Sequence, residues 1–331
     1  MDTERRRLTR PDGRIIEYLV AGPADGLPLV LHEGTPVGLV LYPPTVQAAR
    51  TRGLRVMLAA RPGYEGSTPR PGRRVVDVAE DTAAVLDELG ADTFVTAGWS
   101  GGGPHALACA AALPGRCLAA ASIAGVAPYP ADGLDWLAGM GPENVAEFGA
   151  ALRGEAELTA FLEREAASLS TVTGEGVAKA LGGLVIEADQ AVLTGEFARH
   201  VAASLRAATS SGVAGWRDDD LAFTRDWGFS LGWAAPASAQ RSSASVRPAP
   251  ASARPAPASA RPAPASARPA PVAVWQGDQD QMVPFAHGQW LAANIKGARV
   301  HLMPGEGHLS MTVSAFDRIL DDLLDLAGIR A

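Results

Sequence analysis

Apolar and polar positions alternate along the first 130 residues in a way that predicts strands and helices in turn. Segments 27–31 and 54–60 are almost wholly apolar, as is typical of strands buried on both faces. Segment 42–52 is helical in pattern, and 75–89 carries apolar residues at helical spacing. Further strands are predicted at 14–20, from Thr93 onward and at 118–123, with a helix beginning at Pro104. This order is typical of the α/β class, with a mostly parallel central sheet and helices on both faces.

The same alternation returns near the carboxyl end of the chain. Strands are predicted at 272–276 and 298–303, and helices at 284–294 and 311–326. We therefore expect these residues to complete the sheet that the first 130 residues begin.

The segment between these two parts, 131–233, shows helical patterns and no convincing strand. Helices are predicted at 144–152, 155–168, 177–188 and 196–208. An all-helical insertion into an α/β sheet predicts a cap over the functional site. Its tryptophans are more simply explained as packing within the insertion than as site residues: Trp136, Trp216, Trp227 and Trp233.

A proline-rich repeat follows the helical insertion. The unit Arg247-Pro248-Ala249-Pro250-Ala251-Ser252-Ala253 recurs from Arg254 and from Arg261, and a partial copy covers 268–271. Proline at this density supports neither helix nor sheet, so 234–271 is predicted to be a solvated, polyproline-like loop. Docking to an aromatic groove of a partner is the alternative. The predicted domains are thus a first core part (1–130), a helical cap (131–233), this loop (234–271) and a second core part (272–331).

Composition narrows the class of protein. The chain has 331 residues, 47% of them hydrophobic, and a formal net charge of −7, which argues against nucleic acid as a partner. Its apolar runs are too short to span a bilayer, and residues 1–7 are not followed by an apolar segment, so no secretory signal is predicted. Two cysteines, Cys109 and Cys117, are expected to be reduced thiols. We expect a cytoplasmic protein with no membrane partner and leave open whether it forms a homo-oligomer.

One serine lies in a turn that favours catalysis. Gly98-Trp99-Ser100-Gly101-Gly102 stands between an apolar strand and a helix, which is the arrangement of a nucleophile elbow. Small residues around the serine let the backbone turn sharply, so that the hydroxyl projects from the sheet. The motif alone is common in a chain with 36 glycines, and the surrounding elements must support it.

A nucleophilic serine needs a base, an acid that orients the base, and donors for the oxyanion. His308 follows the strand at 298–303, and Asp280 follows the strand at 272–276, so both are expected at the same edge of the sheet as Ser100. Weaker candidates for the base or the acid are His105, His200, His287, His301, Asp132 and Asp278.

The turn after the strand at 27–31 is the expected second half of an oxyanion hole. A backbone N–H of Gly34-Thr35-Pro36, taken as that of Thr35, could act together with the N–H of Gly101. His32-Glu33 does not begin a zinc motif, because Pro36 stands where a second histidine would be needed. No glycine-rich nucleotide loop occurs, so neither a metal nor a cofactor is predicted.

With these parts in place, the sequence resembles the α/β-hydrolase superfamily over the two core parts. The motifs that carry the resemblance are His32-Glu33-Gly34-Thr35-Pro36, Arg61-Pro62-Gly63-Tyr64, Gly98-Trp99-Ser100-Gly101-Gly102, Gly277-Asp278-Gln279-Asp280 and Gly307-His308. The resemblance implies that Ser100 is the nucleophile, His308 the base and Asp280 its orienting acid. It also implies that Thr35 and Gly101 form the oxyanion hole. Glu33, beside that hole, and the inserted repeat depart from the pattern.

These inferences predict a serine hydrolase that cleaves a small, largely apolar ester or amide without a cofactor. Alternatives on the same fold are a cofactor-free haloperoxidase or perhydrolase and a proline-iminopeptidase-like peptidase. The peptidase would need cap carboxylates to hold an amino terminus, for which Glu143, Glu147 and Glu187 are candidates. The alternative of another class is a non-catalytic binding protein whose repeat recruits partners.

Overall fold

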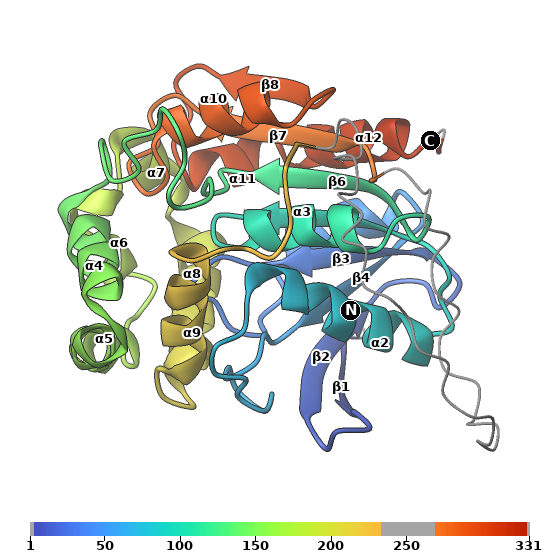
Figure 1. The fold of residues 1–331 in the computed structure, drawn as a ribbon, viewed down its shortest axis with the longest axis horizontal. Helices are drawn as coiled ribbons and strands as arrows, with labels where there is room; N and C mark the ends of the chain where they lie inside the picture. Colours follow the sequence, from blue (N-terminus) through green and yellow to red (C-terminus); the bar gives the residue numbers. More distant parts are fainter. Residues whose placement is uncertain (1–2, 233–268, 330–331) are drawn as a thin grey trace, which may run out of the picture.

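The strands of the protein form one twisted sheet (Figure 1). The computed structural model describes residues 3–232 and 269–329. Its eight strands lie in the order β1-β2-β4-β3-β5-β6-β7-β8, and all neighbours from β4 to β8 are parallel, whereas β2 is antiparallel to β1 and to β4. The strands are β1 (Thr3–Thr9), β2 (Ile15–Ala21), β3 (Leu27–His32), β4 (Leu54–Ala59), β5 (Phe94–Trp99), β6 (Cys117–Ile123), β7 (Val272–Gly277) and β8 (Arg299–Met303). The predicted α/β class with a mostly parallel sheet is confirmed.

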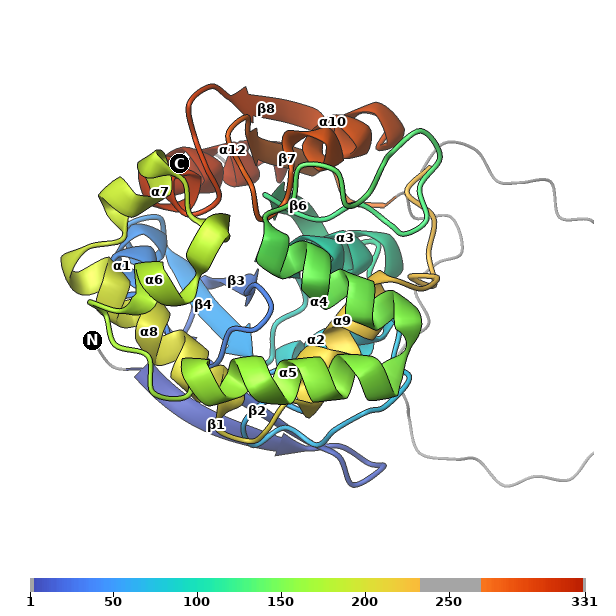
Figure 2. The same ribbon diagram turned by 90° about the vertical axis from the view of Figure 1, so that its left-hand side faces the viewer.

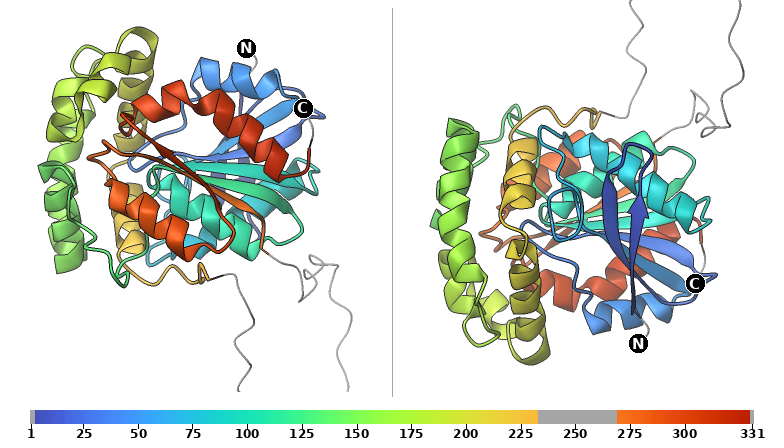
Figure 3. Two further views of the ribbon diagram at one scale, coloured as in Figure 1. Left: turned by 90° about the horizontal axis from the view of Figure 1, so that it is seen from above. Right: turned by 90° about the horizontal axis from the view of Figure 1, so that it is seen from below.

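Helices cover both faces of this sheet (Figure 3). One face carries α1 (Pro43–Arg50) and α12 (Phe316–Leu326); the other carries α2 (Val78–Glu88), α3 (Gly102–Ala112) and α10 (Phe285–Asn294). Alternate strand residues enter the two cores: Leu29 and Leu31 of β3 join the core under α12, and Val30 joins the core under α3. This burial on both faces explains why the central strands are apolar throughout.

The first strand, β1, was not predicted. Its sequence is polar and its residues are mostly exposed, so it carries no apolar period. It pairs along its whole length with β2 at the edge of the sheet, where Arg5 and Arg7 form ion pairs with the buried Glu17. Charged side chains are typical of edge strands, because they discourage pairing with other chains.

Six helices form a separate layer beyond the carboxyl ends of the parallel strands, which Figure 2 shows face on. We call it the α4–α9 layer: α4 (Pro142–Arg153), α5 (Glu155–Leu169), α6 (Val177–Ala180), α7 (Glu187–Val192), α8 (Gly195–Thr209) and α9 (Ala214–Phe223). The helices predicted at 144–152, 155–168 and 196–208 are confirmed as α4, α5 and α8.

Two predicted helices are interrupted, and one helix was not predicted. The segment 177–188 breaks into α6, a short 3₁₀ turn and the start of α7, because Gly182 takes a positive φ of 57°. The helix expected at 311–326 is divided at Ala315 into α11 (Ser310–Ser314) and α12. The helix α9 was missed; eight of its ten residues are buried, including three aspartates, so it shows no clear polar face.

The loop predicted at 234–271 lies outside the described residues except at its end. There the carbonyl of Pro271 accepts a hydrogen bond from the N–H of Ala120, which leads the chain into β7. In the parts of the chain that the structure describes, no helix is both long and apolar enough to cross a lipid bilayer.

The core under α3 gives a test of the fold. Leu107 of α3 is fully buried, so Leu107→Ala should lower the free energy of unfolding by about 2–5 kcal/mol, through lost burial and the remaining cavity. Urea unfolding measures this change. The control Leu302→Ala, on the edge strand β8 where Leu302 is 39% exposed, should change it by at most about 0.5 kcal/mol. Equal losses in both variants would contradict this packing.

Candidate active site

The turn between β5 and α3 holds Ser100 in a strained backbone conformation. Ser100 has a positive φ of 55°, which non-glycine residues rarely adopt, and its N–H donates to the carbonyl of Ile123. A Cβ on Gly98 would lie 2.0 Å from the carbonyl oxygen of Gly102, and one on Gly102 would lie 1.8 Å from that of His32. Both glycines are therefore required for the sharp turn, which has the geometry of a nucleophile elbow.

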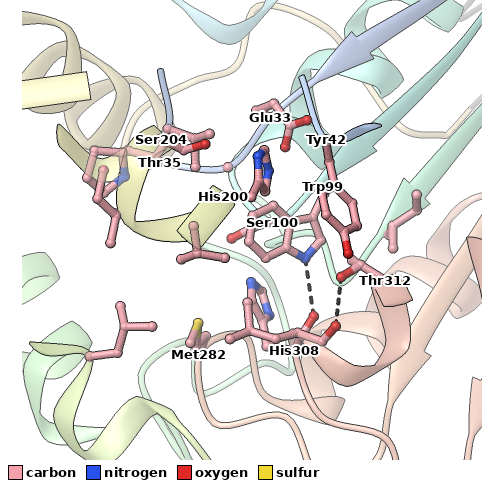
Figure 4. A pocket seen from close by; sticks show the side chains of 18 of the residues that line it. Glu33, Thr35, Tyr42, Trp99, Ser100, His200, Ser204, Met282, His308 and Thr312 are labelled. Atoms are coloured by element: carbon pink, nitrogen blue, oxygen red, sulfur yellow. Dashed lines mark hydrogen bonds between the residues drawn. The ribbon is translucent and has the colours of Figure 1, made fainter. Parts of the chain in front are cut away.

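Ser100 lies on a cavity of about 310 Å³ between the sheet and the α4–α9 layer. Figure 4 shows polar side chains from several elements around it. Among them are His308 after β8, Glu33 and Thr35 after β3, Tyr42 before α1, and His200 of α8. Apolar side chains make up much of the remaining wall: Val37, Phe161, Leu169, Leu181, Leu184, Phe197, Val201, Leu205, Met282, Val313 and Phe316.

His308 is held by a carboxylate behind it. Its Nδ1 lies 2.7 Å from Oδ2 of Asp280, and both side chains are buried. The same oxygen accepts from Nε2 of Gln276, and Oδ1 accepts from the N–H groups of Met282 and Val283. An ionised carboxylate oxygen can only accept hydrogen bonds, so Nδ1 of His308 must be the donor in this contact. When the ring is neutral, its single proton is therefore on Nδ1. Nε2 is then the basic nitrogen.

Trp99 fixes the histidine from the other side. Its ring lies 5.0 Å from that of His308, centroid to centroid, and its indole N–H donates to the backbone carbonyl of His308 (Figure 4). The hydroxyl of Ser100 and the ring of His308 line the same cavity and form no hydrogen bond with each other in this structure. Catalytic hydrogen bonds often form only when substrate is bound.

The turn expected to complete the oxyanion hole lies directly beside Ser100. A Cβ on Gly34 would be 3.3 Å from the Cβ of Ser100, and a Cβ on Gly101 would be 2.6 Å from Oγ1 of Thr35. Neither the N–H of Thr35 nor that of Gly101 donates to another group of the described residues. Two N–H donors without an acceptor beside a serine hydroxyl can stabilise an oxyanion that forms there.

A buried ion cluster behind this turn was not predicted. Asp219 of α9 accepts hydrogen bonds from the guanidinium groups of Arg61 and Arg73 and from the hydroxyls of Tyr64 and Thr35. Burial alone would raise the pKa of Asp219, but the two arginines hold it well below its ordinary value. No sequence motif marks Asp219, which stands between two other aspartates in an unpredicted helix.

The weaker candidates lie elsewhere or serve other contacts. His287 bonds to the backbone of Ala127 and of Trp136, and His301 stacks on Trp275 at 3.7 Å between ring centroids. His105 is buried on α3, 3.5 Å from Asp219, and burial lowers its pKa to about 4. His200 does line the cavity, and burial lowers its pKa to about 4. Asp278 accepts the N–H of Gly305, and the backbone carbonyl of Asp132 accepts the indole N–H of Trp290.

Carboxyl groups gather on the cavity wall. Glu33, Glu143, Glu147 and Glu165 line it, whereas Glu187 is exposed on α7 and does not. Removal from water raises the pKa of Glu33 to about 7, although Arg61 opposes this shift. The pKa of Glu147 is also raised to about 7 by burial, against its bond to the indole of Trp216. Near neutral pH the uncharged form of both carboxyl groups is therefore well populated.

A family model described as alpha/beta hydrolase fold matches residues 28–315. The chain belongs to the alpha/beta hydrolase family. Over 123 residues it is 35% identical to a non-heme chloroperoxidase from Streptomyces lividans, a stretch that covers 37% of this chain and 45% of that relative. The chain thus matches less than half the length of this curated relative.

Solved structures of this hydrolase fold superpose on nearly the whole chain. A bromoperoxidase from Bacillus anthracis is similar with a TM-score of 0.64 and 18% identity, covering 98% of this chain and 100% of that one. A thermophilic esterase from Thermogutta terrifontis has a TM-score of 0.62 and 17% identity, covering 98% and 99%. At these identities the likeness shows the fold alone.

The raised pKa of Glu33 predicts a pH dependence of stability. The folded hydrolase keeps a proton on Glu33 that the unfolded chain releases, so this group stabilises most below its ordinary pKa of 4.5 and the stabilisation is lost as pH rises through about 7. Glu33→Gln, which stays neutral, should lose less thermal stability than the wild type between about pH 5 and about pH 8. Calorimetry across this range measures the difference. The control Glu187→Gln should keep the wild-type slope, and an unchanged slope in Glu33→Gln would refute the assignment.

Proposed function

We propose that this hydrolase cleaves small, largely apolar esters or amides through an acyl-enzyme on Ser100. The observation that carries the proposal is the convergence of Ser100 and the His308–Asp280 pair on one cavity. The unpaired N–H groups of Thr35 and Gly101, beside the serine, support it further. No other serine of the described residues lies in such a strained turn with a histidine on the same cavity.

In this proposal Oγ of Ser100 attacks the substrate carbonyl carbon while Nε2 of His308 takes the hydroxyl proton. The carbonyl oxygen becomes negative and accepts the N–H groups of Thr35 and Gly101, each worth about 3–4 kcal/mol in comparable enzymes. His308 then gives its proton to the leaving alcohol or amine as the bond to carbon breaks. Water, activated by His308 in the same way, attacks the acyl group and releases the acid. Asp280 keeps the ring oriented throughout.

The cavity wall supports a neutral, compact substrate. We propose that the α4–α9 layer is the cap that shapes it, because α5 and α8 supply much of the apolar lining and α4 supplies polar side chains. Among the lining residues that the structure describes, none is a lysine or arginine, and four are glutamates. Such a wall disfavours substrates with an anionic acyl chain. Glu143 and Glu147 could also hold an amino group, so amino-acid naphthylamides belong in the substrate panel.

Replacement of the serine tests the proposal directly. Ser100→Ala should lower hydrolysis of p-nitrophenyl acetate and butyrate by about 10⁴-fold or more and abolish labelling by a fluorophosphonate. His308→Gln should reduce both by a similar factor, because these residues act as a unit. The control Ser314→Ala removes an exposed hydroxyl that bonds to Glu306 outside the cavity and should still be labelled. Labelling that survives in Ser100→Ala would refute the role of Ser100.

A folded wild type that reacts with no ester, amide or fluorophosphonate would favour the alternative of a non-catalytic binding protein.

A second candidate, perhydrolysis, is favoured by the 35% identity to a non-heme chloroperoxidase over part of the chain. Here a carboxylic acid would acylate Ser100 with loss of water, and hydrogen peroxide would replace water as the second nucleophile. The peracid that leaves could oxidise bromide by two electrons to hypobromite and return to the acid. This route needs the same serine, histidine and oxyanion donors as ester hydrolysis.

The two reactions are separated by dependence on the acid. With acetate, hydrogen peroxide and bromide, perhydrolysis should brominate monochlorodimedone, and the rate should fall to background without acetate or in Ser100→Ala. Absorbance of the dimedone measures bromination. Ester hydrolysis without any acetate-dependent bromination would assign the protein to the hydrolases alone.

A further inference from the structure

Two buried aspartates of the α4–α9 layer reach the loops that carry the candidate catalytic groups. Asp189 of α7 and Asp219 of α9 are both completely buried. The loop after β8 holds His308, and the loop after β3 holds Thr35. Each aspartate contacts one of these loops, although the loops follow strands at different places in the sheet.

Asp189 accepts three successive backbone N–H groups of the histidine loop. Its Oδ1 lies 2.8 Å from the nitrogens of Leu309 and Ser310, and its Oδ2 lies 3.3 Å from the nitrogen of His308. The loop is shaped to admit this carboxylate: a Cβ on Gly307 would lie 2.5 Å from both of its oxygens. The position of the His308 backbone thus depends on a side chain that the sheet does not supply.

Asp219 acts on the Thr35 loop both directly and through Arg61. Its Oδ2 accepts the hydroxyl of Thr35 at 3.0 Å and Nη2 of Arg61 at 2.7 Å. Arg61 in turn donates to the backbone carbonyls of Glu33 at 2.7 Å and Gly34 at 2.8 Å. The Gly34 carbonyl and the Thr35 N–H belong to the same planar peptide unit and point in opposite directions, so holding this carbonyl fixes the direction of the N–H.

We propose that Asp189 and Asp219 are positioning residues, through which the α4–α9 layer aligns the histidine loop and the Thr35 loop with Ser100. This inference rests on the proposed function of Ser100 and His308. The layer then sets the rate of acylation as well as the shape of the cavity. Small displacements are sufficient for a large effect, because a shift of about 1 Å in a reacting group can cost about 10²-fold in rate.

The test compares Asp189→Asn and Asp219→Asn with Asp218→Asn as a matched control. Asp218 is also buried on α9, but it pairs with Arg217 of the same helix at 2.8 Å and, among the described residues, forms no hydrogen bond with either loop. For each variant, kcat and KM for p-nitrophenyl acetate and the fluorophosphonate inactivation rate are measured well below the melting temperature. We expect kcat and the inactivation rate to fall by about tenfold or more in the first two variants, with KM within about threefold of wild type.

The control separates positioning from general stability. Asp218→Asn should lower the melting temperature while keeping kcat within about twofold of wild type. If Asp219→Asn does not fold, Asp189→Asn decides, because no cation of residues 3–232 and 269–329 pairs with the Asp189 carboxylate, and asparagine keeps one acceptor oxygen. The inference is overturned if the folded asparagine variants keep kcat, change only KM, or lose no more kcat than the control. A wild type that shows neither turnover nor labelling would overturn the proposed function instead.

Discussion

The ion cluster around Asp219 is the interaction on which the candidate site depends. One carboxylate is enclosed by two guanidinium groups, from Arg61 and Arg73, and all three side chains are buried. Charges in such surroundings are stable only when they are paired and hydrogen-bonded, and loss of one partner typically costs about 3–5 kcal/mol. His105 beside the cluster is neutral at pH 7, because burial lowers its pKa to about 4. The cluster therefore carries one excess positive charge directly behind the turn where an oxyanion would form.

The ionisation state of Glu33 matters because of this excess positive charge. Glu33 lines the cavity, its backbone carbonyl accepts a hydrogen bond from Arg61, and its carboxyl group is near enough to Arg61 for that charge to lower its pKa. If an oxyanion forms in the site as proposed, the neutral form of Glu33 would leave this positive field acting on it, and the ionised form would cancel part of the field. Ionisation of Glu33 near pH 7 would thus change the electrostatic potential in the site as well as the stability of the fold.

The sequence was most informative where a pattern is local. Wholly apolar strands and the turns after them located Ser100, Asp280 and His308 at one edge of the sheet, because parallel strands end together. The edge strand β1 and helix α9 escaped prediction, since neither shows an amphipathic period. Asp189 and Asp219 could not be found either. Their partners lie 119 and 184 positions away in the chain, at His308 and Thr35, and only the folded structure brings them together.

The buried contacts that hold the α4–α9 layer also bear on how reactants enter the cavity. Displacement of this layer would expose the buried carboxylates of Asp189 and Asp219, so we expect it to stay in place and reactants to reach the cavity through a fixed entrance. Val313 and Asp317 both line the cavity and are also exposed to solvent: Val313 is 41% exposed, and the side chain of Asp317 is 73% exposed. The entrance is therefore expected beside α11 and α12. The width of this entrance would then limit which molecules reach the cavity, before any reaction takes place.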